Sequence, residues 1–519
     1  MPQHYSPMDF RLVTRQLGLL LVVLSACMCL VTLVELVSWS TSQAAEQMAV
    51  RALLTSAGIG AVVGLGMWMS GRQMGERFMG RREAMLLVTL SWFLGGVLSG
   101  LPYFLWHLFG GTADAMHPFA NPIDCFYESI SGLTTTGATV LTHIEQLPKA
   151  ILLWREMTHW LGGLGIVVLF VAVLPSLGVG GKRLFNTEAP GPEGEGVRPR
   201  IRETARMLWL IYLGLTVAQT LLLWLCGQTL FDAICNTFGT LATGGFANYD
   251  ASIGHYDSWA VDLVITVFMV IAGVNFAVYY LLVKRRFREA WRDTQMRVFV
   301  IFLLVATGII ALTLWGHEIT TTTGDTRTVG LFGALRYAGF QVASVNSDCG
   351  FATADYDLWG FIPKALLMVG MFFGGCVGST SGGLKIMRVI IIWKALWYEL
   401  EKTFRPTVVR TVRIGDQVVD SEQLRSALMY AVVMVMTLVA GTVVVKLFEG
   451  HATDFVSAGT ANLAAFCNCG PGLGLVGPVN NYEYLADGSK LTLALMMVLG
   501  RLEIFAVAAL LLPGFWRAD

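Results

Sequence analysis

Long apolar runs alternate with short polar or charged segments along most of the chain. A helix needs roughly 20 apolar residues to cross a bilayer, and ten runs come close to that length, Phe361–Cys376 being the shortest. They are Leu17–Val37, Ala52–Met69, Met85–Phe109, Ile151–Leu174, Leu208–Leu225, Trp259–Val283, Val298–Leu314, Phe361–Cys376, Ala427–Leu447 and Leu491–Leu512. The pattern predicts an all-α integral membrane protein.

The first run does not have the features of a signal peptide. It lacks a small-x-small cleavage site followed by a polar region, because Ala52 opens the next run almost at once. We therefore expect it to be retained as a helix.

Composition and charge agree with a membrane protein of defined orientation. Of the 519 residues, 55% are hydrophobic and 14% charged, whereas soluble proteins carry about 25% charged residues. With a cytoplasmic N-terminus and alternating spans, 27 of the 36 basic residues lie inside, seven lie outside, and Lys446 and Arg501 fall within spans. The positive-inside rule then predicts a multi-pass protein with both termini in the cytoplasm.

A polar, glycine-containing turn recurs four times between the spans. It appears as "ESISGLTTTGATVLTH" from Glu128 to His143 and again around three later glycines, each time after an apolar segment too short to cross a membrane. The glycines Gly137, Gly244, Gly350 and Gly470 are separated by 107, 106 and 120 residues. The alternative is that the four segments are ordinary outer loops that happen to contain glycine. Their regular spacing and common position argue against this alternative.

The repeat predicts four units after an N-terminal helix pair. Each unit would consist of a span, a re-entrant pore half-helix, a turn and a second span, arranged with pseudo-fourfold symmetry around a central pore. The expected boundaries are 1–71 for the helix pair, then 72–181, 182–290, 291–400 and 401–519 for the four pore repeats.

Such turns suit the binding of a monovalent cation. Non-helical backbone is tolerated at membrane depth only where protein or a water-filled cavity surrounds it. Glycine permits the dihedrals that aim carbonyl oxygens inward, and the helix C-termini add partial negative charge. Rings of carbonyls select alkali cations, whereas calcium and magnesium sites use carboxylates. We expect Asp348 to be an outer-mouth or structural residue rather than a side-chain ligand.

The motifs together resemble a known family. "SGLTTTGAT", "TGGF", "NSDCGF" and "NCGPG" occur in the order of the four filter loops of the Trk/Ktr/HKT potassium transporter superfamily, most of all those of its bacterial TrkH-type uptake subunits. Further agreement comes from "HWLGGLGIVVL" (159–169), "RLFNTEAPGP…RPRIRETAR" (183–206), "GGCVGSTSGGLKIMR" (374–388) and "LGRLEIF" (499–505). The resemblance covers essentially the whole chain from about residue 80.

The resemblance implies a potassium-selective pore in the bacterial inner membrane. Main-chain oxygens around each filter glycine would bind K⁺: Thr135, Thr136 and Gly137; Ala242, Thr243 and Gly244; Asp348, Cys349 and Gly350; and Asn468, Cys469 and Gly470. It also implies a homodimer bound to cytosolic TrkA-type nucleotide-binding subunits, with no nucleotide bound by this chain. The basic segments 182–206, 284–297 and 385–425 are docking candidates, or simply topology signals beside anionic lipid.

The short run 361–376 continues into a glycine-rich segment that we expect to break the helix. A helical glycine costs roughly 1 kcal/mol relative to alanine, and the family has an intramembrane gating loop here, 374–385. The gate residues would be Gly374, Gly375, Gly378, Ser379, Thr380, Ser381, Gly382 and Gly383. The alternative is a helix-packing face formed by Gly370, Gly374 and Gly378.

Four further charged residues fall within or next to the apolar runs. Arg501 is costly within a span, and in the family this arginine projects into the pore as an electrostatic barrier to cations. An ion pair with Glu503 or another buried acid is the alternative. We expect Lys446 to snorkel to the outer surface, and Arg155 and Glu156 to form a surface pair.

The function predicted is potassium uptake through a gated, channel-like pore. A secondary transporter, for K⁺/H⁺ symport or an organic solute, is the alternative, because such proteins also use broken helices. No buried acid chain indicates a proton relay. The nine cysteines lack zinc-site spacing and are interpreted as free thiols. No catalytic motif indicates an enzyme.

Overall fold

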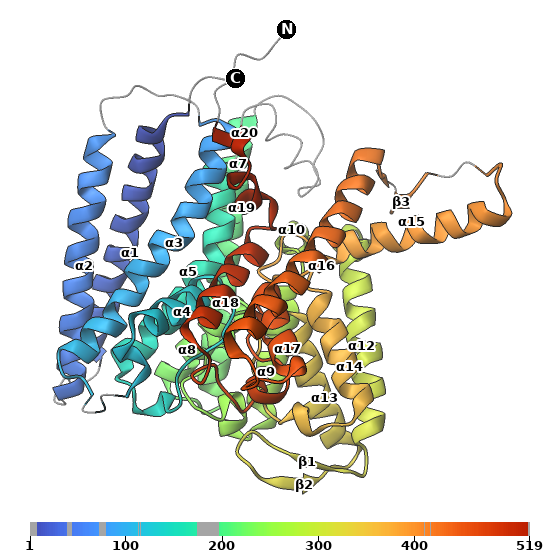
Figure 1. Cartoon of the computed structure of the whole chain (residues 1–519). Helices are drawn as coiled ribbons and strands as arrows, with labels where there is room; N and C mark the ends of the chain where they lie inside the picture. The colour runs from blue at the N-terminus through green and yellow to red at the C-terminus, as the bar shows by residue number, and fades with distance from the viewer. Residues whose placement is uncertain are drawn as a thin grey trace.

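A computed structural model describes residues 8–38, 44–71, 79–112, 114, 116–173, 197–408, 411–415 and 417–516, with only the backbone of 37–38, 164–173, 197–205 and 417. Nearly all of its regular structure is helical (Figure 1). The strands form two antiparallel hairpins, β1 (Glu318–Thr320) with β2 (Thr326–Thr328) and β3 (Arg413–Ile414) with β4 (Gln417–Val418). Ile319 lies opposite Arg327, and Ile414 lies opposite Gln417.

The first two helices pack side by side along their length at one edge of the molecule (Figure 1). They are α1 (Phe10–Ser38) and α2 (Ala44–Ser70). A Cβ placed on Gly18 would lie 2.5 Å from the carbonyl oxygen of Gly64, so glycine is needed where the two backbones cross. Small residues at such crossings are how membrane helices approach closely.

The remaining chain places a short helix after each of four long ones. The long helices are α3 (Arg81–Leu108), α7 (Val197–Leu225), α12 (Thr294–Leu314) and α16 (Ser421–Glu449). The short helices are α4 (Pro122–Leu133), α8 (Leu230–Leu241), α13 (Leu331–Asn346) and α17 (Phe455–Cys467). With 12 to 16 residues each, the short helices cannot cross a bilayer on their own.

Each short helix is followed by a further helix or helix pair. These are α5 (Lys149–Val173), α9 (Trp259–Gly273) with α10 (Phe276–Val283), α14 (Phe361–Phe372), and α18 (Asp487–Arg501) with α19 (Phe505–Leu510). The other helices are α11 (Phe287–Ala290), α15 (Ile386–Phe404) and α20 (Pro513–Trp516). Single 3-10 turns occupy Pro118–Ala120, Ile144–Gln146, Ser252–Tyr256, Tyr356–Leu358 and Gly474–Val476.

Two runs that the sequence predicts as continuous spans are broken. Between Trp259 and Val283, α9 and α10 meet at 99°, and the side chain of Asn275 caps α10 by accepting a hydrogen bond from the N–H of Ala277. The run Leu491–Leu512 stops at Arg501 and resumes at Phe505, across Glu503 and Ile504 with φ of 54° and 59°. Hydropathy misses both breaks because apolar residues continue on either side.

Side-chain caps explain where three of the short helices begin. Asn121 accepts a hydrogen bond from the N–H of Ile123 ahead of α4, with Pro122 in the first position of the helix. Thr229 accepts from Asp232 at α8, and Asp454 accepts from Ser457 at α17. Such caps satisfy N–H groups that have no partner within the helix.

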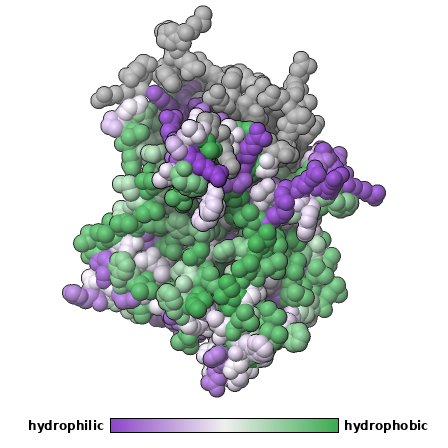
Figure 2. Space-filling view, turned by 90° about the vertical axis from the view of Figure 1, so that its right-hand side faces the viewer, coloured by the Kyte–Doolittle hydropathy of each residue, from purple (hydrophilic) through white to green (hydrophobic). Residues whose placement is uncertain are grey.

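The outer surface of the helices is suited to lipid. Among the described residues, six helices are long and apolar enough to cross a membrane, or seven with the bent pair α9–α10. Large apolar side chains point outward, such as Leu304 on α12 and Met436 on α16. Figure 2 shows a broad hydrophobic band across one face, with hydrophilic side chains above and below it. The protein is therefore a multi-pass membrane protein.

Candidate functional site

The four short helices end in the same backbone turn. One residue at or just after each helix cap lies in the left-handed region, with φ of 54° to 59°. Thr135, Thr243 and Asp348 follow the cap residue, and Asn468 is itself the cap of α17. The N–H of each left-handed residue donates to the carbonyl three residues back, and the next N–H donates to the carbonyl five residues back, the Schellman pattern. A residue other than glycine costs roughly 1–2 kcal/mol in this region, so the surrounding packing must stabilise all four turns.

The turns meet one another through glycine. Two residues beyond each left-handed residue lies a glycine with φ of 77° to 88°. These glycines are Gly137, Gly245, Gly350 and Gly470. A Cβ on each would approach the carbonyl oxygen of the residue before the glycine in the next turn. The distances are 2.0 Å from Gly137 to Gly244, 1.9 Å from Gly245 to Cys349, 2.1 Å from Gly350 to Cys469 and 2.8 Å from Gly470 to Thr136. The four contacts close a ring in chain order.

The backbone corrects the sequence alignment of the second turn by one residue. The sequence spacing pairs Gly244 with Gly137, Gly350 and Gly470. In the structure, Gly245 is the residue equivalent to these three glycines, as judged by the left-handed residue, the helix-capping bonds and the contact between turns. The triplet equivalent to Thr135–Gly137 is therefore Thr243–Gly245, and Ala242 is the helix cap. "TGGF" contains two adjacent glycines, and sequence alone does not show which one needs the positive φ.

The threonines of the first turn bond to each other and to the fourth turn. Thr136 shares a 2.9 Å hydrogen bond with Thr134 and accepts another of 2.9 Å from the amide of Asn468. The same amide donates to the carbonyl of Met497 in α18. The hydroxyl of Thr136 and the side-chain amide of Asn468 thus hold the first and fourth turns together.

Asp348 does not lie at an outer mouth. Its side chain is fully buried, and a Cβ on Gly374 would lie 2.8 Å from its carboxylate oxygen. The carboxylate therefore faces the segment that follows α14, and the outer-mouth interpretation is wrong. The structural interpretation stays a prediction.

The glycine-rich segment after α14 is a folded loop, as its glycines predict. Helix α14 ends at Phe372 and α15 begins at Ile386, so Gly374 and Gly378 lie beyond α14 and form no helix-packing face with Gly370. The hydroxyl of Ser381 accepts from the N–H of Gly375 at 2.9 Å and bonds to Ser379 at 2.8 Å. Internal bonds thus define the loop.

The loop packs against the ends of two short helices. The hydroxyl of Thr380 donates to the carbonyl of Leu241 at the end of α8. A Cβ on Gly382 would lie 2.2 Å from the carbonyl oxygen of Cys467 at the end of α17. Backbone bonds from Cys376 to Gly273 and from Phe276 to Gly378 join the loop to the break between α9 and α10.

Arg501, the last residue of α18, is buried beside this loop. Its guanidinium donates to the carbonyl of Thr380 at 2.6 Å and to that of Gly162 in α5 at 3.4 Å. Glu503 instead pairs with Arg388, so the proposed pair with Glu503 is wrong. Within the described part of the chain, no carboxylate lies within ion-pair distance of Arg501.

Arg155 and Glu156 are fully buried rather than a surface pair. Arg155 bonds to Glu128 of α4 at 2.7 Å and lies 4.0 Å from the ring of Phe246. Glu128 also accepts from the hydroxyl of Thr139 and from the N–H of Val140. The ion pair thus anchors the chain leaving the first turn to α4 and α5.

Two more buried ion pairs join short helices to their neighbours. Lys490 of α18 bonds to Asp124 of α4 at 2.6 Å, and Arg336 of α13 bonds to Asp262 of α9 at 2.6 Å. Lys446 donates to the carbonyls of Gly450 and Thr453 beyond the end of α16, as expected of a snorkelling residue.

Comparisons with known proteins identify the family of the chain. Residues 104–513 match the family model of the TrkH cation transport proteins. The chain belongs to the TrkH family. This is a family of transporters rather than of enzymes. The matched residues contain all four turns, the loop after α14 and Arg501.

Individual relatives span the same length. The chain is 37% identical to the Trk system potassium uptake protein TrkH of Salmonella typhimurium and 36% identical to that of Escherichia coli K12, in each case over 98% of this chain and all of the relative. A crystal structure of the potassium transporter TrkH from Vibrio parahaemolyticus superimposes with a TM-score of 0.82 at 32% identity, covering 98% of this chain and 100% of that one.

Part of the TrkH-like sequence lies outside the described residues. In the motif spanning 183–206, the backbone is described from Val197 and side chains only from Arg206. The docking candidate 182–206 is therefore described only in its last part. Segment 284–297 is described throughout, and its six basic residues are all exposed: Lys284, Arg285, Arg286, Arg288, Arg292 and Arg297.

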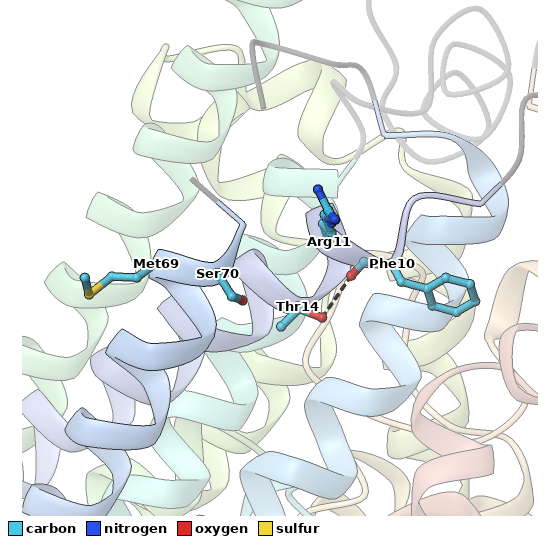
Figure 3. A pocket seen from close by; sticks show the side chains of 5 residues that line it. All are labelled: Phe10, Arg11, Thr14, Met69 and Ser70. Atoms are coloured by element: carbon cyan, nitrogen blue, oxygen red, sulfur yellow. Dashed lines mark hydrogen bonds between the residues drawn. The ribbon is translucent and has the colours of Figure 1, made fainter. Parts of the chain in front are cut away.

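One cavity lies away from the turns, at the ends of the first two helices. This cavity of about 520 Å³ is lined by Phe10, Arg11, Thr14, Met69 and Ser70, at the start of α1 and the end of α2 (Figure 3). Thr14 bonds to the carbonyl of Phe10 within α1. With Arg11 as its single charged side chain, the cavity has no convergent set of polar groups.

Several side-chain contacts that hold the TrkH-type turns were not predicted from the sequence. His159 and Arg155 contact the first two turns from α5, and Asn468 joins the fourth turn to the first through its side chain. For Arg155 and His159, the available signal was a charged or polar residue near the start of an apolar run. It does not reveal which helix end the side chain meets.

Proposed function

We propose that this chain takes up potassium through a pore whose filter is the ring of four turns. The observation that carries the proposal is a closed series of contacts between the turns. Each glycine of positive φ lies against the next turn, at the carbonyl oxygen of the residue just before that turn's own glycine. Four equivalent turns bring four sets of carbonyls around one axis. Neutral carbonyls in such a ring replace the hydration shell of a monovalent cation.

The proposed K⁺ ligands are main-chain oxygens. They come from Thr135, Thr136 and Gly137, from Asp348, Cys349 and Gly350, and from Asn468, Cys469 and Gly470, with Thr243, Gly244 and Gly245 in the second turn. The C-termini of α4, α8, α13 and α17 precede these residues. Their partial negative charges favour a cation at the ring.

The loop after α14 and Arg501 are proposed as gate and barrier. The loop contacts the ends of α8 and α17, so a movement of the loop changes what lies beside the ring. Arg501 adds a buried positive charge bonded to that loop. A fixed positive charge there raises the energy of a passing cation.

The wider assembly is also part of the proposal. The four units follow an N-terminal pair, 1–71, with boundaries after 181, 290 and 400, and surround a pseudo-fourfold pore in the bacterial inner membrane with both termini in the cytoplasm. The relatives are named as Trk system proteins. We propose that this chain likewise forms a homodimer that binds cytosolic TrkA-type nucleotide-binding subunits through exposed basic residues of 284–297.

The second candidate function is K⁺/H⁺ symport. Glu156 is fully buried, and neither of its carboxylate oxygens has a hydrogen-bond partner among the described residues. A protonatable carboxylate within the membrane is the group that a proton-coupled carrier needs. The sequence had indicated no such acid.

Ion flux into liposomes tests the proposal. Purified protein in vesicles free of both ions is expected to admit K⁺ down a K⁺ gradient faster than it admits Na⁺ down an equal Na⁺ gradient. Absence of flux, or equal rates for both ions, would reject a potassium-selective pore.

A further inference from the structure

In two of the four turns, the second residue braces the turn against the short helix of the preceding unit. The thiol of Cys349 donates to the carbonyl of Gly239 in α8 at 3.7 Å. The thiol of Cys469 donates to the carbonyl of Val345 in α13 at 3.7 Å. A thiol is a weak donor, but both contacts are buried and connect adjacent members of the ring.

In the second turn this position is Gly244, which has no side chain. The imidazole of His159, from α5, fills the space instead, since a Cβ on Gly244 would lie 2.5 Å from its Cγ. Its Nδ1 lies 2.8 Å from the carbonyl oxygen of Gly132 in α4.

The acceptor of this bond is equivalent to the acceptor of the Cys469 thiol. Gly132 accepts the capping N–H of Thr135 in the first unit, just as Val345 accepts that of Asp348 in the third. His159 thus makes from α5 the contact to the preceding short helix that Cys469 makes from its own turn.

The other ring nitrogen fixes the orientation of the imidazole. The N–H of Phe246, just beyond the second turn, donates to Nε2 of His159 at 3.2 Å. Nε2 is therefore the acceptor, and the proton is on Nδ1, which donates to Gly132. The imidazole is fully buried and packs 4.2 Å from the ring of Phe246. It bonds to one helix end and to one turn at the same time.

We propose that His159 is a positioning residue of the filter, which supplies the side chain that Gly244 lacks and sets the position of the Gly244 carbonyl. This carbonyl is the one against which Gly137 packs. The inference rests on the proposed function, because it assumes that the ring selects the ion. Without the imidazole, the second turn relaxes and discrimination against the smaller Na⁺ falls.

A rescue experiment tests this role. Purified variants in planar bilayers give the K⁺/Na⁺ permeability ratio from reversal potentials. His159→Ala is expected to lower the ratio several-fold, and Gly244→Cys alone to disturb the turn because its Cβ meets the imidazole. The double variant His159→Ala/Gly244→Cys removes the clash and supplies a thiol equivalent to that of Cys349. It is expected to recover much of the wild-type ratio.

The matched control is His159→Ala/Gly245→Cys. A Cβ on Gly245 lies 1.9 Å from the carbonyl oxygen of Cys349, which removal of the imidazole does not relieve. This variant is expected to show no recovery. Equal permeability ratios in His159→Ala and in His159→Ala/Gly244→Cys would overturn the inference. A wild-type ratio in His159→Ala, with a loss of thermal stability alone, would overturn it too.

A second pair of variants keeps the test informative if His159→Ala does not fold. His159→Gln can still donate to Gly132 and accept from Phe246, so it is expected to keep the ratio. His159→Leu, of similar size without polar atoms, is expected to lower it. Equal ratios in this pair would overturn the inference. If the wild-type protein shows no potassium-selective current, the proposed function itself fails, which is a different outcome.

Discussion

Arg501 donates a 2.6 Å hydrogen bond to the carbonyl oxygen of Thr380, so the charged end of α18 is bonded to the loop after α14. The hydroxyl of Thr380 continues the contact to Leu241, the last residue of α8. A buried positive charge, the loop and one helix end of the ring therefore form a single connected unit. We therefore expect Arg501 to act on conduction in two ways, through its charge and through its hydrogen bonds.

Replacement of Arg501 is expected to separate these effects. Arg501→Ala removes both charge and bonds, and should raise the single-channel conductance as well as the open probability. Arg501→Gln keeps a donor for Thr380 without the charge, and should raise conductance with little change in open probability. Single-channel recording measures both quantities. Wild-type conductance in both variants would contradict the barrier role.

Gly137→Ser is expected to weaken discrimination between K⁺ and Na⁺. The new Cβ would lie 2.0 Å from the carbonyl oxygen of Gly244, so that carbonyl must move. Gly245→Ser should have a similar effect, because the backbone pairs Gly245 with Gly137. Reversal potentials in mixed K⁺ and Na⁺ solutions measure the change. Gly66→Ser, where a Cβ meets nothing within 4 Å, is the control. Unmoved potentials in the first two variants would argue against the carbonyl ring.

Ser381→Ala is expected to destabilise the closed loop. The substitution removes the acceptor of the Gly375 N–H and the bond to Ser379. Open probability should rise while the K⁺/Na⁺ ratio stays unchanged, because the turns are not altered. Thr403→Ala, at an exposed position in α15, provides the control. An unchanged open probability, or a changed ratio, would contradict the role of the loop as a gate.

Glu128→Gln is expected to destabilise the protein. Breaking a buried ion pair typically costs about 3–5 kcal/mol, and both Glu128 and Arg155 are fully buried. The double variant Glu128→Leu/Arg155→Met leaves no unpaired charge and should lose less stability than Glu128→Gln. The comparison variant is Arg327→Gln, which breaks a partly exposed ion pair with Asp257. Its loss of unfolding free energy is expected to be about 0–1 kcal/mol. Thermal unfolding in detergent compares the three, and equal losses would refute the ranking.

The sequence predicted the elements whose signal is local. Glycines mark the turns and the broken helix after Phe372, and apolar length marks spans such as α3 and α12. The second turn was misaligned by one residue because Thr243 is followed by two glycines. Only the contacts between turns show which of them closes the ring.

The missed features depend on packing between distant segments. The apolar run around Asn275 gives no sign that the chain bends by 99° there. Arg155 resembles a residue at the end of a span until α4 brings Glu128 to it. His159 belongs to a recognisable motif, but its two partners, Gly132 and Phe246, lie 27 and 87 residues away.

Single-channel recording with and without a pH gradient tests the central claim most directly. Purified wild-type protein in a planar bilayer, under a K⁺ gradient, should carry a current at equal pH that reverses at the K⁺ equilibrium potential. An imposed pH gradient should leave that reversal potential unchanged. A current that requires the pH gradient, or a reversal potential that shifts with it, would contradict a conducting potassium pore and favour symport.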